Sequence, residues 1–220
     1  MQVLLSSYIR GLSRPAEIVI VVMIFAGWFS YASIQAVLAG FPPPQFEDTG
    51  LVLLLVFEMA AFAIAWTLLR VRGWRLAHFN IDPSWGGLLV GALLFGFSLI
   101  IDAALWELFA KHSAARAIIE DIARTKTATP IVVLLVSIVN GTFEEFFLTG
   151  YLLKALRPAG ASAALGVSAF VRMTYHLYQG PLGALTVMAF GLLITVFYWR
   201  YRTLWPVICA HIFADIVALA

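Results

Sequence analysis

The chain has 220 residues, of which 62% are hydrophobic and only 12% are charged, and its formal net charge is +2. A typical soluble domain is about 45–50% apolar and about 25% charged, so this composition leaves too few polar residues to cover a water-exposed surface. Soluble globular proteins, disordered chains and nucleic-acid-binding proteins are therefore excluded. The single cysteine, Cys209, excludes an intramolecular disulfide bond and a zinc cluster built on cysteines.

Apolar stretches recur along the whole sequence. A transmembrane helix needs about 20 consecutive, mostly apolar residues. In chain order, such stretches predict about seven spans, at residues 18–39, 51–69, 85–109, 131–153, 161–178, 182–198 and 204–219, separated by segments rich in glycine and proline. We therefore expect an all-α fold, a polytopic transmembrane helical bundle.

Lysine and arginine in the loops predict the orientation, because these residues are enriched on the cytoplasmic side. With the N-terminus inside, the basic residues that fall inside are Arg10, Arg14, Arg70, Arg72, Arg75, Lys154, Arg157, Arg200 and Arg202. Those that fall outside are Lys111, Arg116, Arg124 and Lys126. This bias predicts a cytoplasmic N-terminus. Residues 114–122 have apolar positions at helical spacing and are predicted to lie on the membrane surface.

A few ionisable residues fall inside the predicted spans, where such groups usually face the interior of a bundle or a cavity. They are Glu58, Asp102, Glu107, Glu144, Glu145, Arg172, His176, His211 and Asp215. Residues four apart share a helix face, which places Arg172 beside His176 and His211 beside Asp215. Glu144 and Glu145 are adjacent and point about 100° apart, so we expect them to have different roles.

Two adjacent carboxylates in an apolar helix need a cation, a hydrogen-bond donor or a proton. At membrane depth the positive charge comes from Arg172, His176 and His211. A carboxylate with two imidazoles in a low-dielectric cavity is suited to activating water, with the carboxylate as general base and the imidazoles as acids or oxyanion stabilisers. Glu144, His176 and His211 also suit a divalent metal such as zinc, with an open position for water. The residues alone leave both mechanisms open.

Three motifs in the C-terminal part resemble those of a known family. Residues 143–150, FEEFFLTG, are similar to the EExxxR segment of the CPBP family, the CAAX-protease and bacteriocin-processing membrane proteins, also called the ABI family. His176 resembles the histidine of the family's FxxxH motif. His211 and Asp215 resemble its closing HxxxN/D motif. The order of the motifs agrees, and the resemblance covers residues 130–220. Residues 1–129 form an N-terminal region of spans without a recognised motif.

The resemblance implies an intramembrane endopeptidase. Glu144 would activate the attacking water with His176, while His211 and Asp215 would position or stabilise the tetrahedral oxyanion. Glu145 would have a structural role. The implied partners are the lipid bilayer and a membrane-associated or lipid-modified peptide or protein, and the expected location is a bacterial cytoplasmic membrane. The resemblance does not decide whether a metal takes part.

Two positions depart from the motifs. The arginine of EExxxR is Thr149 here, and the phenylalanine of FxxxH is Arg172. Charge balance predicts that the two changes are linked, with Arg172 reaching across from the fifth span to supply the missing cation beside Glu145. Because the motif arginine is absent, a second function stays possible: a catalytically silent family member that acts as a membrane binding or immunity partner. A small transporter is a third reading, since buried Glu, His and Arg also form proton relays, but the sequence has no inverted repeat.

Two further expectations concern depth in the membrane. Glu58 lies in the middle of the second span without a nearby cation in sequence, so we expect it to pair with Arg172 or stay protonated, outside the active site. Straight helices would leave His176 roughly two turns nearer the membrane surface than Glu144 and His211, at about 1.5 Å per residue. A break of the fourth helix at Gly141 or an early end of the fifth would bring His176 level with them.

Overall fold

A computed structural model describes residues 2–43, 46–109, 118, 120 and 127–220. The surface segment predicted at residues 114–122 lies outside this part except for residues 118 and 120. Lys111, Arg116, Arg124 and Lys126, the basic residues assigned to the outer side, also lie outside it. The orientation of the chain in the membrane therefore stays a prediction.

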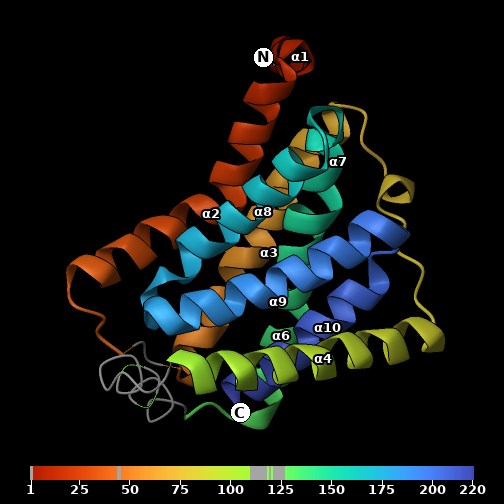
Figure 1. Ribbon diagram of the computed structural model, residues 1–220. Coiled ribbons are helices and arrows are strands. Elements are labelled where there is room, and N and C mark those ends of the chain that lie inside the picture. The colour runs from red at the N-terminus through yellow and green to blue at the C-terminus, as the bar shows by residue number, and fades with distance from the viewer. Residues whose placement is uncertain (1, 44–45, 110–117, 119, 121–126) are drawn as a thin grey trace.

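The described part of the chain is helical, as predicted (Figure 1). Its elements are α1 (Gln2–Gly11), α2 (Arg14–Leu38), α3 (Asp48–Val71), η1 (Leu76–Phe79), α4 (Trp85–Phe109), α6 (Pro130–Glu144), η2 (Glu145–Leu152), α7 (Leu153–Leu156), η3 (Arg157–Ala159), α8 (Ala161–His176), η4 (Leu177–Gln179), α9 (Gly180–Tyr201) and α10 (Trp205–Leu219). Of the short elements, η2 is π-helical, and η1, η3 and η4 are 3₁₀-helical.

The apolar helices are long enough for a membrane protein. In the described residues, five helical runs have the length and hydropathy of a span: α2, α3, α4, Pro130–Ala159 and Ala161–Tyr201. The apolar helix α10 is shorter. Each of the seven predicted spans falls on a helix, but the fifth and sixth belong to the single run Ala161–Tyr201, because only η4 separates α8 from α9. The chain is thus an integral membrane protein with an all-α fold.

The helix α6 and its continuation η2 lie at the centre of the bundle. The run Pro130–Ala159 is the most buried of the candidate spans, and α4 is the least buried. Helix α6 packs against α3 and α10, while α8 packs against α2 and α9. In Figure 1, α8 and α9 form the two arms of a V that crosses the middle of the molecule. Polar residues on α6, α8 and α10 therefore meet inside the protein.

A glycine brings α10 close to α6 at the level of the buried carboxylates. A Cβ atom added to Gly141 would lie 3.0 Å from the Cγ1 atom and 3.0 Å from the backbone nitrogen of Ile212. Such contacts are tighter than side chains ordinarily make, so a larger residue at position 141 would push the helices apart. Gly141 lies within the continuous helix α6, so the break of the fourth helix considered above does not occur there.

A buried carboxylate that the sequence reading missed ties the first helices to the centre. Glu17 is fully buried, and its carboxylate pairs with Arg14 at 2.7 Å and with Arg72 Nε at 2.6 Å. The same carboxylate accepts hydrogen bonds from Trp74 Nε1 at 3.1 Å and Tyr151 Oη at 3.0 Å. Because Tyr151 belongs to η2, these contacts anchor α2 and the end of α3 to the segment that follows Glu144.

Candidate active site

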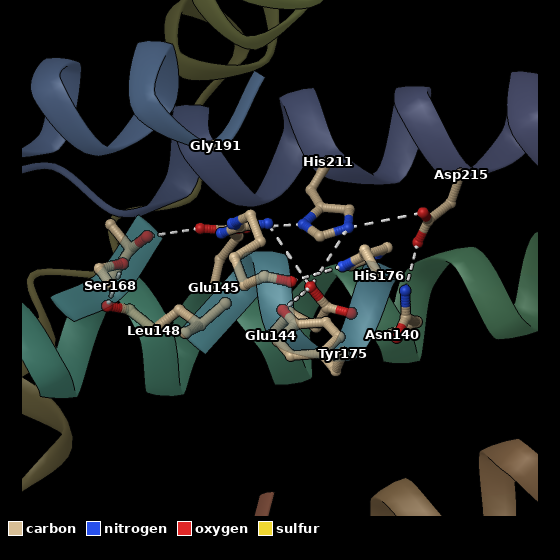
Figure 2. Close-up of polar contacts among 12 residues, drawn as sticks. Asn140, Glu144, Glu145, Leu148, Ser168, Tyr175, His176, Gly191, His211 and Asp215 are labelled. Carbon is tan, nitrogen blue, oxygen red and sulfur yellow. Dashed lines mark hydrogen bonds and ion pairs between the residues drawn. The ribbon is translucent and has the colours of Figure 1, made fainter. Parts of the chain in front are cut away.

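Glu144 ends α6 and Glu145 begins the π-helical segment η2. Figure 2 shows both side chains beside those of Tyr175 and His211. Short π-helical segments inside helices are frequent at functional sites. The two side chains differ in exposure as well as direction. Glu145 has no exposed surface, whereas Glu144 is 7% exposed and lines a cavity. The two carboxylates therefore have different surroundings, and their different roles stay a prediction.

Glu145 is held by three buried side chains from three elements. Its Oε1 atom lies 2.6 Å from Arg172 Nη2 on α8 and 2.6 Å from His211 Nδ1 on α10. Its Oε2 atom accepts a hydrogen bond of 2.6 Å from Thr149 Oγ1, one turn along η2. Both oxygens of this buried carboxylate are engaged, and losing any partner would leave a desolvated charge, in line with the structural role predicted for Glu145.

Arg172 makes the contact that charge balance predicted from the sequence. Besides Glu145, its guanidinium group approaches Glu144, with Nη1 3.5 Å from Oε2. Thr149, at the position of the motif arginine, adds only a hydrogen bond, so the cation beside Glu145 comes from α8 instead of η2. The contribution of Arg172 and Glu145 to activity stays a prediction.

The polar contacts described for Glu144 all involve one carboxylate oxygen, Oε2. Tyr175 Oη donates a hydrogen bond of 2.5 Å to Oε2, and His211 Nε2 lies 3.9 Å from the same atom. Tyr175 was missed in the sequence reading, where an aromatic residue beside His176 reads as ordinary packing. Its hydroxyl orients Glu144 and stabilises the ionised carboxylate.

His211 lies among three carboxylates. Its Nδ1 atom faces Glu145, and its Nε2 atom lies 3.5 Å from Asp215 Oδ1, one turn further along α10. Asp215 is fixed from the other side, because Asn140 Nδ2 donates a hydrogen bond of 2.8 Å to Oδ2. The sequence search considered ionisable groups only and therefore missed Asn140, although it lies one turn before Glu144 on α6. Carboxylates on both ring nitrogens favour a positively charged imidazole.

A cavity of about 350 Å³ opens beside Glu144. Its polar lining residues are Glu58, Asn140, Glu144, Tyr175, His176, Tyr178, Gln179, Thr186 and Asp215, and its apolar wall includes Phe29, Leu51, Leu54, Val136 and Leu219. These residues come from α2, α3, α6, α8, η4, α9 and α10. The cavity is large enough for a few residues of an extended peptide and for water.

His176 reaches this cavity because α8 ends early. The helix stops at His176, and the 3₁₀ turn η4 leads directly into α9, which starts at Gly180. Of the two solutions considered for the depth of His176, the early end of the fifth helix is the one observed. The Nδ1 atom of His176 lies 3.0 Å from the carbonyl oxygen of Arg172, so Nδ1 carries the proton that this carbonyl accepts.

Glu58 lies at the cavity, where the sequence reading did not expect it. We expected it to pair with Arg172 or stay protonated, outside the active site. In the structure it lines the same cavity as Glu144, and none of the ion pairs described for Arg172 involves it. It is 1% exposed, and its Oε2 atom has no hydrogen-bond partner among the described residues.

The residues were also considered as a site for a divalent metal such as zinc. Glu144, Glu145 and His211 each offer a ligand atom, and these atoms lie within 4.8 Å of one another; His176, a predicted ligand, is not in this group. The guanidinium group of Arg172 already pairs with both carboxylates, and Thr149 takes the second oxygen of Glu145. A metal ion here would lie against a fixed positive charge, so this arrangement does not fit a resident divalent metal.

Comparison with protein families gives one match. Residues 126–217 match the family described as "Type II CAAX prenyl endopeptidase Rce1-like". Searches of curated proteins and of solved structures give no match. The matched segment contains the cavity-lining residues Glu144, His176 and Asp215 and the buried pair Glu145 and His211. The match identifies residues 126–217 as an Rce1-like CAAX prenyl endopeptidase domain, a protease domain of the CPBP family.

Proposed function

We propose that this protein is an intramembrane endopeptidase in which Glu144 activates a water molecule to cleave a membrane-associated or lipid-modified peptide. One observation carries the proposal: of two adjacent buried carboxylates, Glu145 is enclosed by protein partners and Glu144 lines the cavity. If both carboxylates only stabilised the fold, neither would need to face a cavity. We place the protein in a bacterial cytoplasmic membrane with its N-terminus in the cytoplasm, following the basic residues of the loops.

The first step is attack of water on the peptide carbonyl. Glu144 takes one proton from the water as its oxygen bonds to the carbonyl carbon, and the carbonyl oxygen becomes an oxyanion. The contacts on Oε2 leave Oε1 of Glu144 for the water. His176 assists, because its Nδ1 proton is held by the carbonyl oxygen of Arg172 and its Nε2 atom is then a hydrogen-bond acceptor.

The second step breaks the carbon–nitrogen bond. The proton held by Glu144 passes to the peptide nitrogen, which leaves as an amine, and the oxyanion collapses to a carboxylic acid. The positive charge of His211, oriented by Asp215, lowers the energy of the oxyanion in this low-dielectric site. Asn140 holds Asp215 in place for this role.

The catalytically silent partner protein remains the second candidate, and one contact favours it. Arg172 pairs with Glu144 as well as Glu145, so the cluster also stabilises a bundle that performs no chemistry. The two candidates differ in one respect that can be measured. A peptidase creates new peptide ends, whereas a binding partner creates none.

The deciding comparison uses membranes that contain wild-type protein or Glu144→Gln at matched expression. New peptide termini are catalogued in both by mass spectrometry, in water enriched in ¹⁸O. The proposal predicts termini that are present only with the wild type and carry ¹⁸O in the new carboxylate. A lipid-modified residue beside these termini would assign the substrate class. Identical catalogues from equally stable proteins would overturn the proposal in favour of the partner protein.

A further inference from the structure

We infer that Glu58 binds the main chain of the substrate peptide as a neutral carboxylic acid. This inference rests on the proposed function and adds a substrate-binding residue outside the three motifs that the chain shares with its family. Glu58 lies on α3, in the region without recognised motifs, and lines the cavity together with Glu144 of α6. Helices α3 and α6 pack against each other, so the two carboxyl groups enter the cavity from neighbouring walls.

The surroundings of Glu58 do not compensate a negative charge. Its Oε2 atom is buried without a hydrogen-bond partner among the described residues, and no lysine or arginine is found among the described residues that line the cavity. Glu144, in contrast, receives the Tyr175 hydroxyl and the Arg172 guanidinium. Of two carboxyl groups in one low-dielectric cavity, the one without partners keeps its proton.

A neutral carboxyl group offers one donor and one acceptor side by side. A peptide unit offers the complement, a C=O acceptor and an N–H donor, so an extended peptide in the cavity is a matching partner for the Glu58 carboxyl group. Buried polar atoms without partners are rare in proteins because they cost stability. Glu58 is therefore expected to lower the stability of the free protein and to recover that cost when substrate binds.

Two variants of Glu58 separate this role from its alternatives. Glu58→Gln keeps a donor and an acceptor but cannot carry a charge, whereas Glu58→Met keeps the length of the side chain and removes both. We expect Glu58→Gln to cleave the wild-type-specific peptides within about twofold of the wild type. Glu58→Met should raise KM by about tenfold or more, as expected for a lost hydrogen bond to a peptide group. Its melting temperature should be equal to or above that of the wild type.

Glu144→Gln is measured in parallel, so that the two proposals fail in different ways. Wild-type-specific cleavage that persists unchanged in Glu58→Met overturns the inference and leaves the peptidase intact. Glu58→Gln as impaired as Glu58→Met also overturns it, because a charged Glu58 would then be binding a basic group. A Glu58→Met protein that melts well below the wild type shows a structural role instead. Equal catalogues for wild type and Glu144→Gln overturn the peptidase, and the inference with it.

Discussion

Arg172 and Gly191 are packed so closely that position 191 has no room for a side chain. A Cβ atom added to Gly191 on α9 would lie 2.5 Å from Arg172 Cδ and 2.7 Å from its Nε. Arg172 is 1% exposed, and its guanidinium end is fixed on Glu145. The motif has its arginine at position 149, next to the paired carboxylates. In this chain the arginine is Arg172, which reaches Glu145 from α8 and passes over Gly191 of α9.

Gly191→Ala should therefore disturb the active site without touching a polar residue. The new methyl group collides with the part of Arg172 that cannot move while its end pairs with Glu145. Overpacking of this kind costs about 1–3 kcal/mol of stability. Thermal unfolding in detergent measures it, and cleavage should fall together with stability.

The matched control is Gly166→Ala on α8, because a Cβ atom there has no heavy atom within 4 Å. It should leave activity unchanged and add up to about 1 kcal/mol of stability, as alanine does where its backbone conformation is compatible. Equal behaviour of the two alanine variants would show that Arg172 does not need the space at Gly191.

If the changes at positions 149 and 172 are linked, an arginine at position 149 should restore the stability that is lost when Arg172 is replaced. Arg172→Phe alone removes the guanidinium partner of the buried Glu145 carboxylate, which costs about 3–5 kcal/mol. Adding Thr149→Arg should restore most of the loss, because the Thr149 side chain already points at Glu145 Oε2 from 2.6 Å. Unfolding midpoints of both variants decide the question. A double variant no more stable than Arg172→Phe would mean that the positions do not exchange the cation.

Asp215 offers a test of how His211 is oriented. Asp215→Asn keeps an oxygen that accepts from Asn140, and the closing motif allows either residue, so we expect cleavage within about tenfold of the wild type. Asp215→Leu removes the hydrogen bond from Asn140 and the ion pair with His211, and should lose about 100-fold, the effect of a missing hydrogen bond to a charged group. The comparison of kcat between the two purified variants checks this. Equal rates would remove Asp215 from the mechanism.

The Glu17 contacts should affect stability and leave chemistry alone. Glu17→Gln weakens the hydrogen bonds from Arg72, Trp74 and Tyr151 and should cost about 1.5–3 kcal/mol. Glu47→Gln, at an exposed residue whose side chain does not cap α3, is the control and should stay within about 0.5 kcal/mol. Cleavage per folded molecule should match the wild type in both. A lower kcat in Glu17→Gln would show that these contacts position the site through η2.

The sequence predicts the helices well, because spans depend on hydropathy and the chain has few polar interruptions. It also predicts the contact between Arg172 and Glu145, since few cations exist at membrane depth. Glu17 was missed because the first span was read from residue 18, which placed this carboxylate in a loop. It is instead buried in the first turn of α2.

The sequence reading also missed the neutral residues that bind the site's carboxylates. Asn140 and Tyr175 carry no charge at neutral pH, so a reading limited to charged residues and histidines passed over them, although they hold Asp215 and Glu144. Glu58 was placed outside the site because no cation lies near it in the sequence. Only the packing of α3 against α6 brings it to the cavity, and hydropathy alone does not predict which helices become neighbours.

The most direct test of the proposed mechanism compares Glu144→Gln with Glu145→Gln in one preparation. Glu144 is expected to perform the chemistry and Glu145 to hold the helices together. Glu144→Gln should therefore keep a melting temperature close to the wild type and lose all wild-type-specific cleavage. Glu145→Gln should melt well below the wild type, because Arg172 and His211 lose a buried counter-charge. Full cleavage by a stable Glu144→Gln protein would contradict the assignment of Glu144 as the general base.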